Sequence, residues 1–282
     1  MQTSGSLETI ATGFNSPEGP AFSASGDLYF VNWLSSSILR LGPDGQPREF
    51  VNTGGIPAGL AFHPDGTLYC ADEGDQIHGV IAISQSGEIR RFVDSYQDRP
   101  LNGANDLVFD RNGVLYFSDP WGSSMQKPFG GFYRAFPDGR IEQIDTGLAF
   151  PNGVAINADE SAVFLAETGP NRILRYAIGR DGSLGPRTVF ANLSGRPGPD
   201  GMAFDVEGRL YVAQHGNGRV LILDPDGREV DAIPVPGAKP TNVAFGGPGY
   251  ESLVITEVAT ASLYRMRLGV KGQQLFGGLR SR

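Results

Sequence analysis

Six positions along the chain, each near the start of a similar short segment, provide a set of oxygen-bearing side chains. They are Glu18, Ala58, Asn105, Asn152, Asp200 and Thr241. Two carboxylates and two amide carbonyls form an all-oxygen donor set whose two negative charges balance a divalent cation. Such hard ligands favour Ca²⁺, with Mg²⁺ or Mn²⁺ next. The sequence therefore predicts a divalent-cation site built from these positions.

Turn formation is the alternative interpretation of the same residues, because Pro-Asn-Gly and Pro-Asp-Gly are ordinary turn tripeptides. Pro-Asp-Gly also occurs at 64–66 and 225–227, where no chemistry is assigned to it. The six positions differ because they precede the same strand in every repeat. Glu18 and Asn105 also stand where a turn has no need of that residue type, so metal binding is the favoured interpretation.

The positions belong to an internal repeat. Each repeat has two alternating segments joined by a glycine turn, as in 199–204 followed by 210–215. The repeats begin at positions 17, 57, 104, 151, 199 and 240, and these spacings of 40 to 48 residues are typical of four-stranded propeller blades. We therefore predict an all-β fold: a six-bladed β-propeller with four antiparallel strands per blade.

The connections between strands predict two different faces. The hairpin turns within each repeat are short and uniform, whereas the longest connections, 94–104 and 120–131, fall on the opposite face. The first strand of each repeat should line the central channel and point its six candidate positions toward this variable face, where function usually resides. Segment 7–12 is expected to close the ring by completing the last blade, with 273–278 as its rival.

A second group of mostly acidic residues stands at the end of the second strand of each repeat. Its members are Asn32, Asp72, Asp119, Glu167, Gln214 and Glu257, with His215 following one of them. Such groups around one channel mouth could transfer protons or orient metal ligands. As the alternative, acids at strand ends often accept hydrogen bonds from loop N–H groups.

Composition limits the function classes. The chain has 282 residues, of which 40% are hydrophobic, and the repeat predicts one domain over residues 1–282. A net charge of −8 without a basic cluster argues against nucleic acid as a partner. No apolar run is long enough for a membrane span, and the N-terminus lacks the pattern of a signal peptide, so we expect a cytoplasmic protein. Cys70, the only cysteine, excludes an intrachain disulfide. The sequence does not predict the oligomeric state.

Several segments together resemble the senescence marker protein (regucalcin)/gluconolactonase family of six-bladed propellers. They are Ser-Pro-Glu-Gly-Pro at 16–20, Asn-Asp-Leu at 105–107, Tyr-Phe-Ser-Asp-Pro at 116–120, Phe-Pro-Asn-Gly-Val-Ala at 150–155, Pro-Asp-Gly-Met-Ala at 199–203 and Leu-Gly-Val-Lys-Gly at 268–272. The similarity spans nearly the whole chain. It implies hydrolysis of sugar lactones or related cyclic esters.

The resemblance also implies roles for individual residues. Glu18, Asn152 and Asp200 would hold a divalent metal, most simply Ca²⁺, although Mg²⁺, Mn²⁺, Zn²⁺ or iron would also be compatible. Asn105 would lie beside the metal as a ligand or substrate contact, and Asp200 would double as the catalytic acid/base. Regucalcin-type members carry a substrate-contacting Arg two residues before the equivalent of Asn105, where this chain has Gly103 and the nearest upstream arginine is Arg99.

Further substrate contacts are predicted on the variable face. The segment 120–131 carries Trp121 and Phe129 and should form a pocket wall or lid above the metal. Asp119, His215 and Arg99 complete the set of candidate substrate-binding residues. The expected activity is that of a metal-dependent lactone hydrolase acting on a small molecule. The alternatives are an organophosphate or aryl-ester hydrolase on the same metal, and a metal-stabilised binding propeller without turnover.

Overall fold

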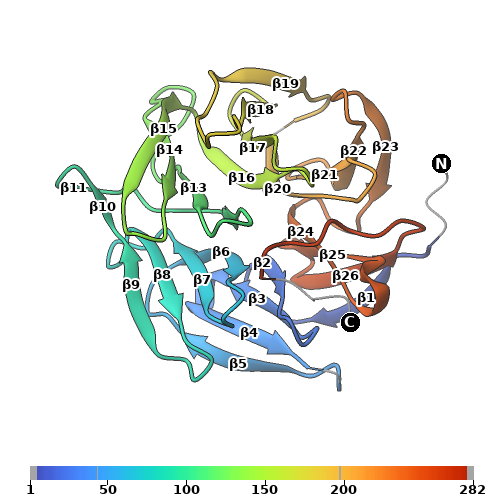
Figure 1. Ribbon diagram of the computed structural model, residues 1–282. Coiled ribbons are helices and arrows are strands. Elements are labelled where there is room, and N and C mark those ends of the chain that lie inside the picture. The colour runs from blue at the N-terminus through green and yellow to red at the C-terminus, as the bar shows by residue number, and fades with distance from the viewer. Residues whose placement is uncertain (1–4, 43, 197, 278–282) are drawn as a thin grey trace.

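The computed structural model describes residues 5–42, 44–196 and 198–277 and contains six four-stranded antiparallel sheets arranged as blades around a central axis (Figure 1). The inner strands, which contact one another around the axis, are β2 (Pro17–Phe22), β6 (Pro57–Phe62), β12 (Leu107–Phe109), β16 (Pro151–Ile156), β20 (Pro199–Phe204) and β24 (Pro240–Gly246). These strands define blades 1 to 6 in chain order. The predicted all-β, six-bladed propeller is confirmed.

The remaining strands follow the order that the repeat predicts. The second strands are β3 (Leu28–Asn32), β7 (Leu68–Asp72), β13 (Leu115–Asp119), β17 (Ala162–Glu167), β21 (Leu210–Gln214) and β25 (Ser252–Glu257). The third strands are β4 (Ser37–Leu41), β8 (Gly79–Ile83), β14 (Gly130–Ala135), β18 (Arg172–Ala177), β22 (Arg219–Leu223) and β26 (Ser262–Arg267). The outer strands are β5 (Pro47–Asn52), β9 (Ile89–Val93), β15 (Ile141–Leu148), β19 (Thr188–Asn192), β23 (Glu229–Pro234) and β1 (Glu8–Thr12).

Short elements lie in the connections between strands. They are the 3₁₀ turns η1 (Trp33–Ser35) and η2 (Pro248–Tyr250) and the two-stranded hairpin of β10 (Ser95–Tyr96) and β11 (Arg99–Pro100). Figure 1 shows this hairpin at the outer edge of the ring. None of the described residues forms a helix long and apolar enough to cross a bilayer.

Aspartate and glycine close the hairpins on the uniform face. In blade 5, the Asp205 carboxylate accepts hydrogen bonds from the backbone N–H groups of Glu207 and Arg209, both at 2.9 Å. Gly208 between them has a φ of 79°, a left-handed conformation that glycine adopts without strain. This local chemistry turns the chain sharply enough for β20 and β21 to pair.

The N-terminal strand closes the ring. β1 pairs antiparallel with β26, so that Glu8 faces Arg265 and Thr12 faces Ser262. An ion pair between Arg265 Nε and Glu8 Oε1 at 2.6 Å joins the two strands. The prediction that an N-terminal strand completes the last blade is therefore confirmed, and the described part of the rival segment, 273–277, forms no strand of that sheet. Gly278 lies outside the described residues.

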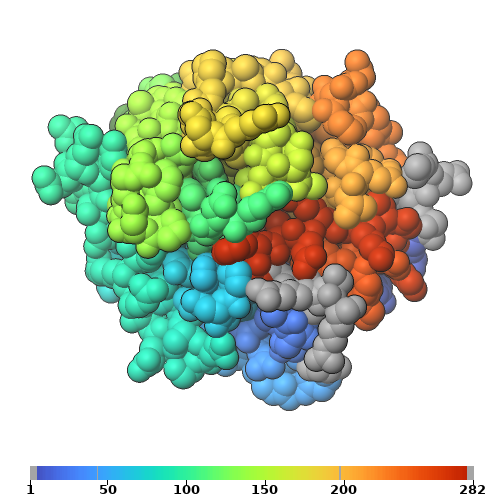
Figure 2. Space-filling view, viewed as in Figure 1, coloured from blue at the N-terminus to red at the C-terminus, as the bar shows by residue number. Residues whose placement is uncertain are grey.

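The C-terminal segment 268–277 lies across the uniform face instead. Figure 2 shows it, in red, over the middle of this face. The Gln273 backbone N–H donates to Phe204 O and its side-chain Nε2 donates to Ile156 O, both at 3.0 Å, which ties it to the ends of two inner strands. Gln273 and Leu275 line a cavity of about 70 Å³ between the inner strands. The segment therefore covers the uniform end of the central channel.

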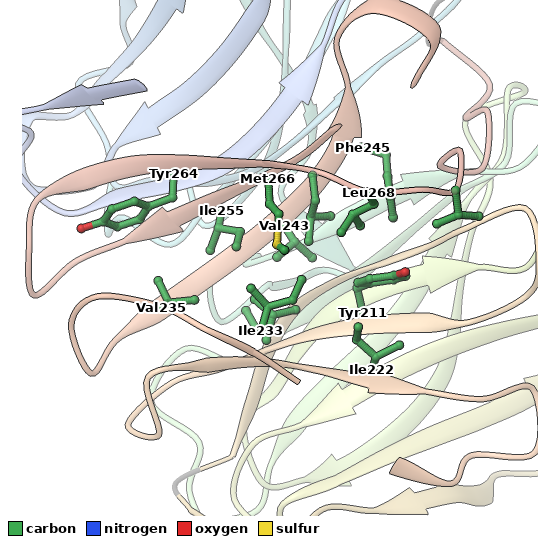
Figure 3. Close-up of a cluster of buried hydrophobic side chains, with 14 residues drawn as sticks. Tyr211, Ile222, Ile233, Val235, Val243, Phe245, Ile255, Tyr264, Met266 and Leu268 are labelled. Atoms are coloured by element: carbon green, nitrogen blue, oxygen red, sulfur yellow. The ribbon is translucent and has the colours of Figure 1, made fainter. Parts of the chain in front are cut away.

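Apolar side chains between neighbouring sheets hold the blades together. Figure 3 shows the cluster between blades 5 and 6, where Tyr211 and Ile222 face Val243, Phe245 and others. The Tyr211 and Phe245 rings meet edge to face with centroids 5.1 Å apart. Each sheet thus buries its apolar faces against its neighbours, and a blade requires the rest of the ring for its stability.

Candidate functional site

Five of the six candidate positions are the second residue of an inner strand. Glu18 lies in β2, Ala58 in β6, Asn152 in β16, Asp200 in β20 and Thr241 in β24. Asn105 comes two residues before β12. All six therefore stand at the beginning of an inner strand, at the end of the channel opposite the C-terminal segment. The structure places them around the axis in the order of their blades.

Glycines beside the candidate residues let the inner strands approach closely. A Cβ atom on Gly19 would lie 2.1 Å from Ala58 O, and one on Gly153 would lie 2.3 Å from Asp200 O. A Cβ on Gly59 would lie 2.7 Å from Asp106 Cα, and one on Gly201 would lie 2.0 Å from the Asn242 side chain. The pairing of β16 with β17 shifts register between Pro151 and Val154, and bulges of this kind re-aim neighbouring side chains. The glycines and the bulge together bring the inner strands close to one another at this end of the channel.

In the two blades that lack this glycine, a polar side chain forms the link to the next blade. Asp106 occupies the position in blade 3, and its Oδ2 accepts a hydrogen bond of 2.8 Å from the backbone N–H of Val154. Asn242 occupies it in blade 6, and its Nδ2 donates to Glu18 Oε2 at 3.4 Å. The sequence analysis missed Asp106 as a site residue. Its departure from the glycine pattern was the signal that could have found it.

Four acidic residues concentrate negative charge at this end of the channel. Burial, followed by the charges of Asp200 and Asp106, raises the pKa of Glu18 well above its usual value. Burial and the charges of Asp106 and Glu73 do the same to the pKa of Asp200. Burial raises the pKa values of Glu73 and Asp106 to about 7. The main charges that act on Glu18 and Asp200 are thus other carboxylates.

The amide side chains connect to these acids. Asn152 lowers the pKa of the neighbouring Asp200 carboxyl against the larger effect of burial, and its Nδ2 donates to Thr168 Oγ1 at 3.3 Å. Asn105 Nδ2 donates to Glu73 Oε1 at 2.9 Å. Glu73 Oε2 also accepts from the Trp33 indole Nε1 at 3.1 Å. Glu73, one residue beyond β7, is a second site residue that the sequence analysis missed, because the repeat pattern gave no reason to select a loop residue there.

The second group of residues is used to hold loops. In each blade, the side chain at the end of the second strand hydrogen-bonds to the backbone of the loop that leads into the inner strand. The six pairs are Asn32 with Asn15, Asp72 with Ile56, Asp119 with Gly103, Glu167 with Ala149, Gln214 with Ser194 and Glu257 with Lys239. The alternative interpretation, in which strand-end side chains accept loop N–H bonds, describes five of these contacts, whereas Gln214 donates its Nε2 to Ser194 O.

Asp119 illustrates this arrangement. It is fully buried, its Oδ1 accepts from Gly103 N at 2.7 Å, and its Oδ2 accepts from Asn102 N at 3.0 Å. Both carboxylate oxygens therefore hold the backbone of residues 102 and 103, which lead into Asn105. The structure gives Asp119 a structural part in the site, and its substrate contact stays a prediction.

The predicted aromatic wall lies beside Glu73. The rings of Trp33 and Trp121 have centroids 6.4 Å apart. Trp121 begins a loop whose Met125 and Phe129 side chains are 56% and 44% exposed, which is unusual for apolar groups of this size. The loop is held by its own bonds, such as Ser123 N to Pro120 O at 2.8 Å. Trp121 and Phe129 are thus available to a ligand at the variable face.

The structure does not bring the last two candidate residues into this cluster. Arg99 lies on the exposed β11, at the outer edge of the ring in Figure 1, so its predicted substrate contact is not supported. The charged groups that act on His215 are Lys239 and Glu257, and burial is the main cause of its lowered pKa. Two residues before Asn105, Gly103 has a φ of 142°, and a Cβ there would lie 2.9 Å from Trp121 Cβ.

The donor set is compatible with a hard divalent cation. Among the described residues, no three His, Cys, Asp or Glu side chains are grouped so as to hold a metal by themselves. Amide oxygens from Asn105 and Asn152 would therefore have to complete any set that includes Glu18 and Asp200. The raised pKa values of the buried carboxyl groups show that negative charge at this position lacks compensation. A bound cation would supply that compensation, and oxygen donors suit Ca²⁺.

Comparison with known proteins gives the same family as the sequence motifs. The SMP-30/gluconolactonase/LRE-like region model matches residues 16–259. Lactonase drp35 of Staphylococcus aureus strain USA300 is 32% identical, over 92% of this chain and 85% of the relative. A gluconolactonase from Xanthomonas campestris has a TM-score of 0.83 at 26% identity and covers 94% of this chain and 90% of its own.

A calcium-binding regucalcin from Agrobacterium tumefaciens strain C58 shares the fold, with a TM-score of 0.83 at 22% identity, covering 99% of this chain and 98% of that one. The predicted family is therefore confirmed by the family model and by a relative that matches almost the whole length. This chain belongs to the SMP-30/gluconolactonase/LRE-like family.

Proposed function

We propose that this chain is a metal-dependent hydrolase that opens sugar lactones or related cyclic esters at the variable end of its central channel. The observation that carries the proposal is the cluster of Glu18, Asp106, Asp200 and Glu73 beside two asparagine amides, in a family whose 32%-identical relative is named a lactonase. The gluconolactonase structure, at 26% identity, supports the same substrate class. The regucalcin neighbour, described as calcium-binding, supports a divalent cation.

Glu18, Asn152 and Asp200 would hold the cation, with Asn105 as a fourth ligand or a substrate contact. When bound, the cation would polarise the lactone carbonyl and stabilise the negative charge that develops on its oxygen. Ca²⁺ is the first choice because every donor is oxygen, and Mg²⁺, Mn²⁺, Zn²⁺ or iron are the alternatives. The hydrogen bond from Asn152 Nδ2 to Thr168 Oγ1, at 3.3 Å, would help to orient Asn152 as a ligand.

Asp200 is the residue that we assign to proton transfer. In hydrolysis, the oxygen of water bonds to the carbonyl carbon, and the bond between that carbon and the ring oxygen breaks. Asp200 would take a proton from the water and return it to the ring oxygen, which leaves as a hydroxyl group. In the cation-free protein, burial and neighbouring carboxylates raise the pKa of Asp200. A bound cation would keep this carboxylate ionised and so able to accept a proton.

Aromatic side chains would hold the substrate ring. Trp33 and Trp121 lie together, Trp33 donating to Glu73, and Phe129 is exposed on the same loop as Trp121. Aromatic faces pack well against the C–H surface of a small ring and exclude water from the ester bond. Gly103, packed against Glu73 and Trp121, leaves no room for a side chain at the position where regucalcin-type members carry arginine.

A panel of aldonolactones, aryl esters and organophosphates, assayed with and without a chelator, tests this function. We expect turnover of lactones that the chelator abolishes and added Ca²⁺ restores. Asp200→Asn should lower kcat by roughly two to four orders of magnitude even at saturating metal, the usual contribution of a positioned general base. Asp159→Asn, on an exposed turn of the uniform face, is the matched control and should leave kcat unchanged.

Each other outcome points to a different function. Turnover of phosphoesters or aryl esters alone would indicate an organophosphate or aryl-ester hydrolase on the same site. No turnover at saturating metal would indicate a binding propeller without catalysis. If Asp200→Asn left both metal affinity and kcat intact, the catalytic centre would have to be sought elsewhere in the acidic cluster.

A further inference from the structure

Glu73 connects three blades at the candidate site. It is 3% exposed and lies directly after β7 of blade 2, where its backbone N–H donates to Ile56 O at 2.9 Å. One carboxylate oxygen accepts from Trp33, which η1 carries in blade 1, and the other accepts from Asn105 at the entrance of blade 3. Both oxygens are thus occupied by side chains from the two neighbouring blades.

The main chain of Asn105 is already fixed, so only its amide group has a choice of orientation. Asn105 N donates to Ser118 O at 3.0 Å, and Asn105 O accepts from Gly59 N at 2.6 Å. When Glu73 is ionised, its carboxylate accepts hydrogen bonds and donates none, so the amide turns its NH₂ toward Glu73, as it does here. The amide oxygen is then the end that remains for a cation or a substrate.

We infer that Glu73 is a positioning residue, which holds the Asn105 amide with its oxygen toward the ligand and ties that amide to the Trp33 indole. The inference rests on the proposed function, because it assigns Asn105 Oδ1 to the cation or substrate of that site. Gly103 supports the connection from the other side, since a Cβ on it would lie 2.9 Å from Glu73 O and 2.9 Å from Trp121 Cβ. Glu73 thereby couples the aromatic wall to the oxygen ligands.

The substitution Glu73→Gln tests the inference because it keeps the shape and changes the hydrogen-bonding pattern. Trp33 and Asn105 donate to different oxygens of Glu73, and glutamine replaces one of these oxygens by an NH₂ group, so it can serve only one of the two donors in place. If its oxygen serves Trp33, its NH₂ faces Asn105, whose amide must then turn over and present NH₂ in place of oxygen to the ligand. Ca²⁺ affinity should fall by roughly 10-fold to 100-fold, the usual effect of losing a residue that orients a ligand.

The double variant Trp33→Phe/Glu73→Gln should recover the affinity. Phenylalanine retains the aromatic ring but removes the N–H, so the glutamine oxygen is free to serve Asn105 and the amide keeps its orientation. We expect the double variant to bind Ca²⁺ within about threefold of the wild type, because its ligand-facing groups are unchanged. Glu88→Gln, on an exposed turn of the same blade, is the matched control and should bind as the wild type does.

Calcium titration of the chelator-treated full chain by calorimetry gives the affinities without reference to turnover. Weak binding by Glu73→Gln together with recovery in the double variant supports the inference. Wild-type affinity in Glu73→Gln, or an equal loss in both variants, overturns it. If Glu73→Gln does not fold, the double variant must still fold and bind within about threefold of the wild type, and its failure likewise overturns the inference.

The same titration separates this inference from the proposed function. A wild-type chain that binds Ca²⁺ but hydrolyses nothing on the substrate panel removes the lactonase proposal, and the variants still decide the role of Glu73. A wild-type chain that binds no Ca²⁺ overturns both the metal site and the positioning role.

Discussion

The cation-free protein should lose stability as the pH rises from 5 to 7. Asp106 and Glu73 each have a pKa of about 7 in the folded protein, well above the ordinary values of 3.8 and 4.5. The folded state therefore keeps its protons to higher pH than the unfolded state, and each group stabilises the fold at pH 5 relative to pH 7. At 1.36 kcal/mol per pH unit, and with each group half titrated at pH 7, the loss between pH 5 and pH 7 is about 2 kcal/mol of unfolding free energy per group.

Substitutions of Asp106 and of its equivalent in blade 6, Asn242, test which group causes the loss of stability between pH 5 and 7. Asp106→Asn keeps an oxygen that accepts from Val154 N but removes the titrating group, so the loss between pH 5 and 7 should shrink by about 2 kcal/mol. Asn242→Asp, at the equivalent position of blade 6 and facing Glu18, adds a carboxylate and should steepen the loss. These two changes move the pH dependence in opposite directions without altering the fold.

Urea denaturation in chelator at pH 5 and at pH 7 measures the effect. Saturating Ca²⁺ should remove most of the loss, because the cation binds the ionised site and stabilises the folded state. Cation-free stability that is constant or increases between pH 5 and 7 would refute the reasoning. An unchanged pH dependence in Asp106→Asn would show that this carboxyl group is not one of those responsible.

Two further predictions concern the two ends of the channel. Trp121→Ala should raise KM with little change in melting temperature, and a large loss of stability with unchanged kinetics would contradict a substrate-binding role. Gln273→Ala should lower the free energy of unfolding by about 1 to 3 kcal/mol in urea denaturation, because it leaves the buried Ile156 carbonyl without its donor. Gln126→Ala, on an exposed part of the Trp121 loop, is the control for the second change and should have almost no effect.

The architecture could be predicted because each blade repeats one local pattern. Strands such as β17 bury every residue, and the turns after β12 and β20 carry the Asp-x-x-Gly chemistry seen at Asp205 and Gly208. These are local properties, so they can be read from short windows of sequence. The path of segment 268–277 could not be predicted, because its anchors at Phe204 and Ile156 belong to blades far away in the chain.

The candidate site was only partly predictable for a similar reason. Register alone selected Glu18, Asn105, Asn152 and Asp200, since each stands at the start of an inner strand. Glu73 has no counterpart that the repeat would single out, and only the fold shows that Trp33 and Asn105 converge on it. The strand-end acids were equally regular in sequence, yet the structure shows that they hold loops.

The close packing of the inner strands links the structure of the ring to its chemistry. The glycines beside the candidate ligands admit neighbouring backbones to within 2.1 Å of where a Cβ would lie, so the first polar side chains of several blades must share a small space. Carboxylates held this close repel one another unless they take up protons or share a cation. Protons and the cation therefore compete for the same groups. A chain that widened the ring to relieve this repulsion would also separate Glu18 from Asp200, so the instability of the empty site and its affinity for a cation have one structural cause.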